Sequence, residues 1–447
     1  MLAKLSKWLT SRKTDDKSVV LFLIQGYLTL TIACFIILLL PFSQNEGTSF
    51  INHIFFAVSV ATTTGLAPAD FSATYNMFGQ ASCLFFIQLG GLGYMALSSF
   101  IILEHSHRLP SISAKLLKHE FNLPSKYPLV SFIRSVFAFT VLIECIGTII
   151  LYFAFKSECV SNPLWSAIFH SVSSFCTAGF SLFSDSLVDF QDNNVIIYTI
   201  AALSFLGSIG FIVLVDFMLR ALKKRKSITL TSKLILVAST LITLVSSCLV
   251  FISDDKLFYR GSDGFKDAFF QCISAHTTVG FNSYDMGALN ESSIFIVIIV
   301  MIIGASPAGT GGGIKTTSIS ALFAVLSSTL RQTDHITFLS KEIPARNVYL
   351  AVSSGIFYSV ILVIGTWMLL YFDGDQLLIK ELLFEAASAL STVGLSTGIT
   401  SELSVPAKLT TSALMFVGRL GVLTFGLALV NKAPLMRKKL VQEEIAI

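Results

Sequence analysis

The sequence has little charge. Asp, Glu, Lys and Arg make up only 13% of its 447 residues, whereas soluble globular domains carry about 25%. Hydrophobic residues make up 53%. This balance excludes an ordinary soluble domain and predicts an integral membrane protein with many spans. The net charge of +4 does not indicate nucleic-acid binding, because most basic residues lie in the segments expected on one side of the membrane.

Patterns typical of enzymes and of metal sites are also missing. The seven cysteines lack metal-ligand spacing, and apolar cysteines usually serve packing. No Ser-His-Asp or paired-carboxylate arrangement occurs at a plausible site, so we do not expect an enzyme. The segment "HSH" at 105–107 with His119 is compatible with a metal cluster or with a solvated cytoplasmic loop, and histidines in a polar segment favour the loop. The longest polar segments have about 30 residues, so regulation by a ligand requires another protein.

Eight apolar stretches are long enough to cross a bilayer as helices, which takes about 20 residues each. Helix is the expected conformation, because an open sheet would leave backbone groups unpaired in lipid. We expect the first stretch to be a membrane span and not a cleaved signal peptide, since no small-residue cleavage site follows it. The expected spans are residues 19–41, 78–103, 134–155, 195–219, 232–252, 292–330 (interrupted), 347–372 and 409–430.

The basic residues predict the orientation of these spans. Of the 31 Lys and Arg residues, 23 lie in the termini and in the alternate connections 104–134, 220–233 and 331–346. Basic residues favour the cytoplasmic side. We therefore expect a multi-pass protein of the cell membrane with both termini cytoplasmic. The opposite face is acidic, which either concentrates cations at a pore mouth or simply hydrates the surface.

One short phrase occurs four times on the outer side of the chain. It ends in a glycine, with threonine two residues before, serine six before and phenylalanine ten before. The glycine is followed by leucine or phenylalanine. The glycines are Gly65, Gly179, Gly280 and Gly394; the threonines are Thr63, Thr177, Thr278 and Thr392; the serines are Ser59, Ser173, Ser274 and Ser388; the phenylalanines are Phe55, Phe169, Phe270 and Phe384. Each copy lies between an odd-numbered span and the next span.

These copies predict four tandem helix–pore-loop–helix repeats with pseudo-fourfold symmetry around one central pore. The fold class is all-α. The expected segments are a cytoplasmic N-terminus (1–18), repeat 1 (19–103), repeat 2 (134–219), repeat 3 (232–330), repeat 4 (347–430) and a cytoplasmic tail (431–447). Repeats with the same orientation favour a pore over a carrier with alternating access, whose hallmark is inverted repeats.

A glycine at membrane depth lets the backbone turn, including into conformations with positive φ. Four such loops could present rings of carbonyl oxygens that replace the hydration shell of a cation. The preceding short helices would direct their negative C-terminal ends at the same point. The alternative is an ordinary helix C-cap with a left-handed glycine, which four copies in register disfavour.

The sixth span contains "GASPAGTGGGIK", which no continuous helix tolerates comfortably. Ile314 breaks the phosphate-loop pattern, so nucleotide binding here is rejected. We expect residues 304–316 to form a gate below the loops, with a simple kink as the alternative. The expected gate residues are Gly304, Gly309, Gly311, Gly312, Gly313, Lys315 and Arg419. Arg419 interrupts the last span and needs a protein or water partner; it could repel cations or hold the loop. Lys315 either joins the gate or reaches the membrane surface.

On these loops, together with "QLGGLG" at 88–93, "SFLGSIGF" at 204–211 and "GASPAGTGGGIKT" at 304–316, the chain resembles the Trk/Ktr/HKT superfamily of potassium transporters. It is most similar to the membrane subunit of bacterial Ktr systems. The resemblance covers nearly the whole chain, and the two additional N-terminal spans usual in Trk relatives are missing. It implies a filter that binds potassium at Thr63, Thr64, Gly65, Thr177, Ala178, Gly179, Thr278, Val279, Gly280, Thr392, Val393 and Gly394.

The resemblance further implies a homodimer on a cytosolic RCK-type regulatory subunit that binds the nucleotide. The basic segments 220–226 and 436–439 are candidate contacts with that subunit or with anionic lipid. Potassium is the expected substrate, and no covalently bound cofactor or further metal is expected. The sequence leaves open whether sodium activates transport and whether transport is channel-like or symport. The alternative function is an alternating-access carrier for a small solute or another monovalent cation.

Overall fold

The computed structural model describes residues 16–429, with gaps at 94–95, 97–98, 101–102, 104–113, 115–116, 118–128, 222, 224–226, 334 and 339–340. The expected cytoplasmic tail, most of the N-terminal segment, the 436–439 segment and the "HSH" segment with His119 lie outside the described residues. Within the described part the chain is almost entirely helical. Two short antiparallel strands of two residues each, β1 (Thr337–Phe338) and β2 (Lys341–Glu342), lie in the connection between repeats 3 and 4.

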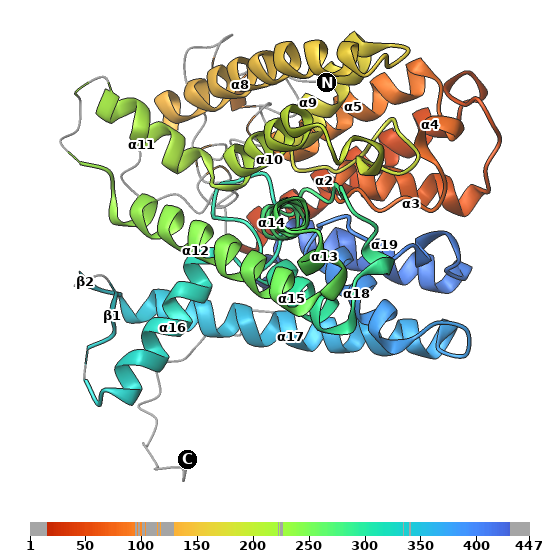
Figure 1. The fold of residues 1–447 in the computed structure, drawn as a ribbon. Helices are drawn as coiled ribbons and strands as arrows, with labels where there is room; N and C mark the ends of the chain where they lie inside the picture. The colour runs from red at the N-terminus through yellow and green to blue at the C-terminus, as the bar shows by residue number, and fades with distance from the viewer. Residues whose placement is uncertain are drawn as a thin grey trace.

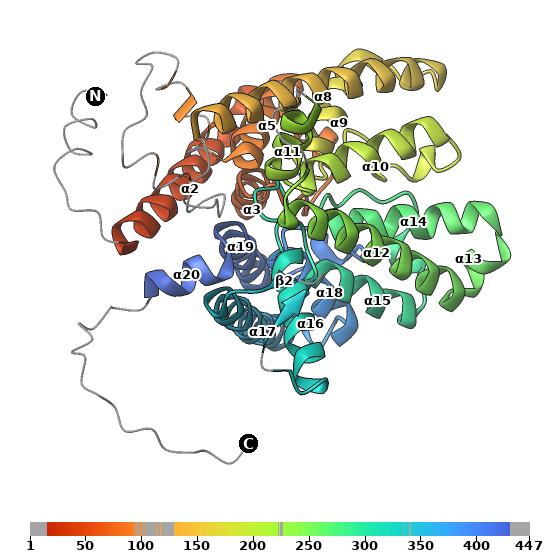
Figure 2. The ribbon, with the colours of Figure 1, turned by 90° about the vertical axis from the view of Figure 1, so that its left-hand side faces the viewer.

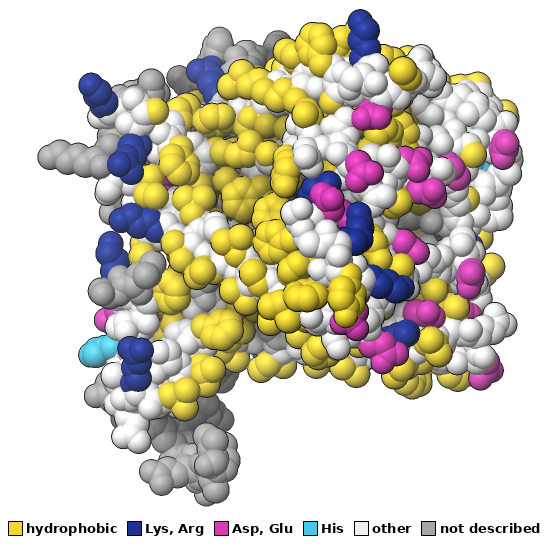
Figure 3. Space-filling model, in the orientation of Figure 1, with side chains coloured by type: hydrophobic (Ala, Val, Ile, Leu, Met, Phe, Trp, Pro, Cys, Tyr) yellow, Lys and Arg dark blue, Asp and Glu magenta, His cyan; other side chains and the backbone are white. Residues whose placement is uncertain are grey.

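Each repeat begins with a long apolar helix. These helices are α2 (Asp16–Leu39), α8 (Leu129–Ser157), α12 (Leu230–Ser253) and α17 (Ala345–Asp373). All four are long and apolar enough to cross a membrane by length and composition. They carry large hydrophobic side chains on their outer surfaces, such as Ile149 and Phe153 of α8, both more than half exposed. An exposed apolar surface of this kind suits lipid, and Figure 3 shows how widely it extends over this face of the molecule.

A shorter, mostly buried helix follows each long one. These pore helices, as we call them, are α3 (Phe50–Ala61), α9 (Pro163–Phe175), α14 (Ser262–Thr277) and α18 (Ile379–Leu390). Short elements surround them on the side where the chain turns: η1 (Pro41–Ser43), α4 (Phe71–Thr74), η2 (Val188–Phe190), α13 (Asp255–Tyr259), η3 (Met286–Ala288) and η4 (Ile399–Ser401). Each pore helix ends at one of the repeated Thr-x-Gly segments.

The last span is divided in repeats 2, 3 and 4, and in repeat 1 its described helix ends before Gly93; the sequence led us to expect a break only in the third repeat. The pieces are α5 (Met77–Leu92), α10 (Asn194–Ser208) with α11 (Phe211–Ala221), α15 (Glu291–Ile302) with α16 (Thr316–Leu330), and α19 (Val405–Leu420) with α20 (Val422–Leu429). The bend between α10 and α11 is 92°. Gly93, Gly210 and Gly421 end the first piece in repeats 1, 2 and 4 with φ of 80°, 90° and 81°. An α-helix cannot continue through a residue with positive φ, so the expectation of continuous helices there was wrong.

The four repeats surround a common centre. Figure 2 shows them in chain order around it, with α2, α3 and α5 beside α8–α11 and with α12–α16 beside α17–α20. Contacts join neighbouring repeats: α5 with α9, α10 with α14, α15 with α18, and α19 with α3. The last of these contacts joins repeat 4 back to repeat 1 and closes the ring. Figure 1 shows α14 end-on near the middle of the view; it packs against α12, α13 and α15 of its own repeat and against α10 of repeat 2.

Candidate functional site: a ring of four backbone loops

The threonines of the repeated segments share an unusual backbone conformation. Thr63, Thr177, Thr278 and Thr392 have φ of 51°, 50°, 59° and 50°. A β-branched residue in the left-handed region is a genuine outlier, and strain of this kind concentrates at functional sites. The glycine two residues later is also at positive φ in every repeat, between 68° and 95°. The sequence predicted positive φ for the glycines but gave no sign of it for the threonines.

The four glycines form a closed ring. A Cβ added to Gly65 would collide with the carbonyl oxygen of Ala178, in the next repeat. The same holds from Gly179 to the carbonyl of Val279, from Gly280 to that of Val393, and from Gly394 back to that of Thr64. The backbone of each loop thus packs directly against the backbone of the next loop, with no side chain between them. Because every contact pairs the same two positions, the loops are related by an approximate fourfold axis.

The serine six residues before each glycine holds its loop to the pore helix, in two different ways. In repeats 1 and 4 the hydroxyl accepts a hydrogen bond from the glycine N–H, at 3.1 Å for both Ser59 and Ser388. In repeats 2 and 3 it donates to the carbonyl of the phenylalanine after the glycine, at 2.9 Å for Ser173 and 2.6 Å for Ser274. These contacts explain why serine occurs in all four copies.

The glycine-rich segment 304–316 lies directly against one side of this ring. Thr177 donates a hydrogen bond from Oγ1 to Thr310 Oγ1 (3.1 Å), and the N–H of Gly312 donates to Thr278 Oγ1 (3.0 Å). A Cβ on Gly312 would collide with Thr392 Oγ1. Among the described residues, the hydroxyls of Thr63 and Thr392 have no hydrogen-bond partner. The segment therefore occupies half of the threonine hydroxyls and leaves the other half unpaired.

The segment is also fixed to its surroundings by backbone hydrogen bonds. Ser306 and Thr310 donate from their N–H groups to the carbonyls of Ser208 and Gly207 at the end of α10, at 3.0 and 3.1 Å. Within the segment, Ala305 N–H donates to Gly312 O at 3.0 Å. Gly304 and Gly313 are in such close contact that a Cβ on either would strike the Cα of the other. A bulkier sequence could not form this loop.

Two cationic side chains bind carbonyls of the segment. The guanidinium of Arg419 donates to Thr310 O and to Gly90 O and Gly91 O in repeat 1. The ammonium of Lys315 donates to Gly311 O at 2.7 Å. Both line a small cavity of about 130 Å³ bounded by the glycines of the segment and by α2. Of the two roles the sequence left open for Arg419, contact with the loop is the one that this geometry favours.

Several residues at the site received no individual role from the sequence, although most of them lie in motifs that it pointed out. Thr310 donates to the carbonyl of Phe175, the last residue of α9, at 3.1 Å. A Cβ on Gly90, Gly207 or Gly418 would strike a carbonyl at the end of the adjacent pore helix. The pattern Gly-x-(Leu/Ile)-Gly, which ends the divided spans at Gly93, Gly210 and Gly421, could have identified these positions.

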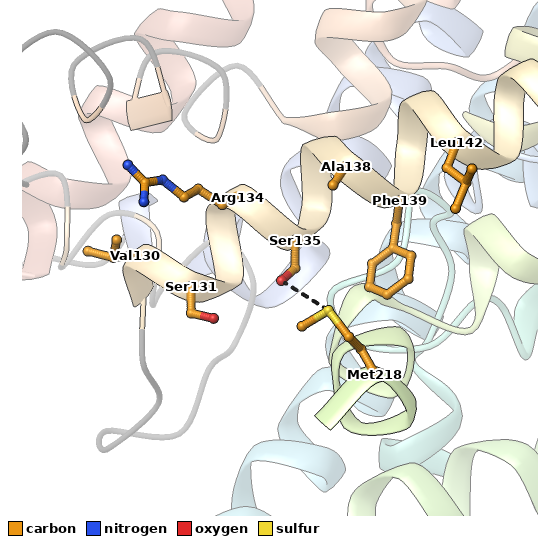
Figure 4. Close-up of a pocket in the computed structure, with 8 residues that line it drawn as sticks. All are labelled: Val130, Ser131, Arg134, Ser135, Ala138, Phe139, Leu142 and Met218. Carbon is orange, nitrogen blue, oxygen red and sulfur yellow. Dashed lines mark hydrogen bonds between the residues drawn. The ribbon is translucent and has the colours of Figure 1, made fainter. Parts of the chain in front are cut away.

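A larger cavity lies elsewhere, between α8 and α11. It has a volume of about 620 Å³ and is lined mainly by apolar side chains and by Arg134 (Figure 4). Ser135 contacts Met218 Sδ at 3.9 Å across it. None of the repeated residues lines this cavity. Among the described residues, no group of three or more His, Cys, Asp or Glu is placed to hold a metal ion.

Four tandem units around a ring of backbone, with apolar helices facing outward, define a pseudo-symmetric membrane transport protein. A family model described as "Cation transport protein", TrkH, matches residues 2–437. The chain belongs to this TrkH family of cation transport proteins.

Relatives with known names agree with this assignment. The chain is 30% identical to "Ktr system potassium uptake protein B" of Vibrio alginolyticus, over 90% of this chain and 89% of the relative. It is also 30% identical to the protein of the same name from Bacillus subtilis and 29% identical to "Potassium/sodium uptake protein NtpJ" of Enterococcus hirae, over 89% of this chain in both comparisons. The crystal structure of the potassium transporter TrkH from Vibrio parahaemolyticus matches with a TM-score of 0.76 and 18% identity, over 94% of this chain and 86% of that one. This structural match shows the fold.

Proposed function

We propose that the chain conducts potassium across the cell membrane through a filter built from the four Thr-x-Gly segments. The observation that carries the proposal is the closed ring of glycine-to-carbonyl contacts. Backbone carbonyls from four equivalent loops can replace the hydration shell of a monovalent cation. The names of the relatives support potassium as the ion. The alternating-access carrier remains the second candidate, but four repeats with one orientation favour a pore.

Within this proposal the filter comprises the residues that the sequence predicted, from Thr63–Gly65 to Thr392–Gly394. Segment 304–316 acts as a gate, because it lies across one side of the ring and binds two of the four threonine hydroxyls. Arg419 and Lys315 hold this gate closed through its carbonyls. The guanidinium of Arg419 is positive, so it also opposes the passage of a cation while the gate stays in place.

The proposal extends to partners and orientation. The relatives named as parts of Ktr systems support a partner protein, for which we propose a cytosolic RCK-type regulatory subunit that binds a nucleotide and a homodimer of this chain. The termini lie on the cytoplasmic side in this arrangement. On the side of the ring that carries segments such as η2 and α13, acidic residues including Asp189 and Asp255 would attract cations. Most of them gather toward one edge in Figure 3.

Ion uptake by cells that lack other potassium systems tests the proposal. Wild type should restore potassium uptake, and Gly280→Ser should weaken it selectively, because the added side chain enters the space of the Val393 carbonyl at a residue with φ of 84°. Gly261→Ser is the matched control, since Gly261 also has positive φ but has no atom within 4 Å of an added Cβ. Uptake that follows another solute, or a silent Gly280→Ser, would favour the carrier.

A further inference from the structure

The position nine residues before each filter glycine is polar in three of the four repeats. It is occupied by Phe56, His170, Gln271 and Glu385, all with 0% exposure. The residue type differs in each repeat, so the position is not part of the repeated phrase. A buried polar group needs a hydrogen-bond partner, because burial without one is costly. The partners of these side chains therefore indicate what the position does.

In each repeat the side chain reaches the segment that follows the filter glycine. His170 Nε2 lies 3.0 Å from Ser181 Oγ, and Gln271 Nε2 donates to Tyr284 O at 3.1 Å. Glu385 Oε1 accepts a hydrogen bond from Thr400 Oγ1 at 2.6 Å. In repeat 1 the ring of Phe56 instead packs against Phe71 and Tyr75, with centroids 6.0 and 5.2 Å apart. We call these contacts braces, since they join the pore helix to the chain leaving the filter.

The brace of repeat 4 differs from the others in its chemistry. Glu385 is the acid of the set, and its second oxygen, Oε2, has no hydrogen-bond partner among the described residues. Thr400 contacts Ser396 Oγ as well (2.9 Å), and Ser396 Oγ accepts from the N–H of Gly398 at 3.1 Å. The turn 396–400 is thus organised around one carboxyl group. Losing that acceptor removes the hydrogen bond that joins Thr400 to the pore helix.

This turn lies where repeats 3 and 4 meet. A Cβ on Gly287, in η3 of repeat 3, would come within 3.0 Å of Thr397 O. On its other side the turn is continuous with Val393 and Gly394, whose backbone contacts close the ring. A shift of the turn would therefore move the Val393 carbonyl against Gly280 of the neighbouring repeat. Discrimination between potassium and sodium depends on the spacing and number of such carbonyls.

We propose that Glu385 is a positioning residue for ion discrimination: through Thr400 it fixes the turn 396–400 and with it the spacing of the filter carbonyls between repeats 3 and 4. The inference rests on the proposed function, because it presupposes that the four loops are the filter. Glu385 does not contact the ion in this scheme. It acts on the ion through backbone geometry.

Three variants separate hydrogen bonding from charge. Glu385→Ala removes the acceptor, Thr400→Val removes the donor at nearly the same size, and Glu385→Gln keeps a carbonyl that can accept from Thr400. The matched control is Glu402→Gln, which removes an exposed carboxylate next to the same turn. Each variant is quantified in the membrane, and KM and maximal rate are measured for potassium uptake together with inhibition by sodium and direct sodium uptake.

Glu385→Ala and Thr400→Val should lower the ratio of potassium to sodium uptake about tenfold, the size of effect expected from losing one buried hydrogen bond. Glu385→Gln should recover most of the ratio, and Glu402→Gln should leave it unchanged. Reduced membrane levels or maximal rates with an unchanged KM and ratio in both disruptive variants would overturn the inference, because the brace would then serve stability alone. So would a ratio that falls equally in Glu385→Gln, which would assign the effect to charge.

The experiments distinguish a failure of the filter proposal from a failure of the proposed role of Glu385. If Gly280→Ser alters uptake while the Glu385 and Thr400 variants keep the wild-type ratio, the filter stands and the brace is rejected. If Gly280→Ser is silent, the filter proposal itself fails. A change in the ratio on Glu385→Ala would then have to act on another pathway, and the inference would fall with the filter.

Discussion

Repeats 1 and 4 differ from repeats 2 and 3 in four connected ways. The residue after the glycine of the repeated phrase is Leu66 or Leu395 in the first pair and Phe180 or Phe281 in the second. The repeat serine accepts from the glycine N–H in the first pair and donates to the phenylalanine carbonyl in the second. The glycine φ is 95° in both members of the first pair and 68° or 84° in the second.

The fourth difference concerns the segment 304–316. It binds the threonine hydroxyls of repeats 2 and 3 and leaves those of repeats 1 and 4 without a partner among the described residues. The ring itself is nearly fourfold, but its attachment to the proposed gate is one-sided. The proposed gate therefore binds side chains of the proposed filter in only two of the four repeats, so substitutions in the two pairs of repeats should have different consequences.

The largest effect is expected from breaking the ring. Gly394→Ala places a methyl group against the Thr64 carbonyl at a residue with φ of 95°. A displacement on the order of 1 Å at a geometrically demanding site can cost roughly a hundredfold in rate, and we expect potassium uptake to fall by about that factor. Gly261→Ala is the control, since Gly261 has φ of 60° but no atom within 4 Å of an added Cβ. Equal losses in the two variants would mean that backbone strain, and not the ring, causes the effect.

A smaller effect is expected at the arginine that ties the gate to repeat 1. Arg419→Ala removes hydrogen bonds to Thr310 O, Gly90 O and Gly91 O. Loss of bonds from a charged donor should shift the balance of closed and open states about tenfold, raising potassium flux without the regulatory partner. Flux into vesicles that contain the chain alone measures this.

Arg419→Lys separates the two roles of this side chain. Lysine keeps the charge but cannot reach the carbonyls on both sides in the same fork geometry. Flux that rises in the lysine variant supports a tether, whereas flux that stays low supports an electrostatic barrier. Arg331→Ala, at an exposed arginine after α16, controls for loss of positive charge in general.

The smallest effect tests the difference between the two halves directly. Thr310→Val removes two neutral hydrogen bonds, from Thr177 Oγ1 and to Phe175 O, which should raise partner-free flux about fivefold, within the range for neutral hydrogen bonds. Thr63→Val removes a hydroxyl that the gate does not touch, so it should change the KM for potassium and leave partner-free flux at the wild-type level. If both variants change the same parameter, the proposed division between the halves is wrong.

Much of the architecture could be predicted because it follows from composition and repetition. Low charge and long apolar stretches indicated a membrane protein, and the recurring Ser, Thr and Gly positions indicated four equivalent parts. The match to the TrkH family and to a TrkH structure agrees with that fold class. The division of the spans at Gly210 and Gly421 was missed, since a single glycine within an apolar stretch is also tolerated in a continuous helix.

The sequence by itself determined that this protein folds in a membrane, how many repeats it has and which residues recur in them. These properties depend on hydrophobicity and on spacing along the chain. Only the tertiary structure decided which carbonyl meets which glycine, which threonines bind the segment 304–316, and that Glu385 and Thr400 form a pair. Those contacts join residues of different helices and repeats, and their distances depend on how the helices pack around the common axis.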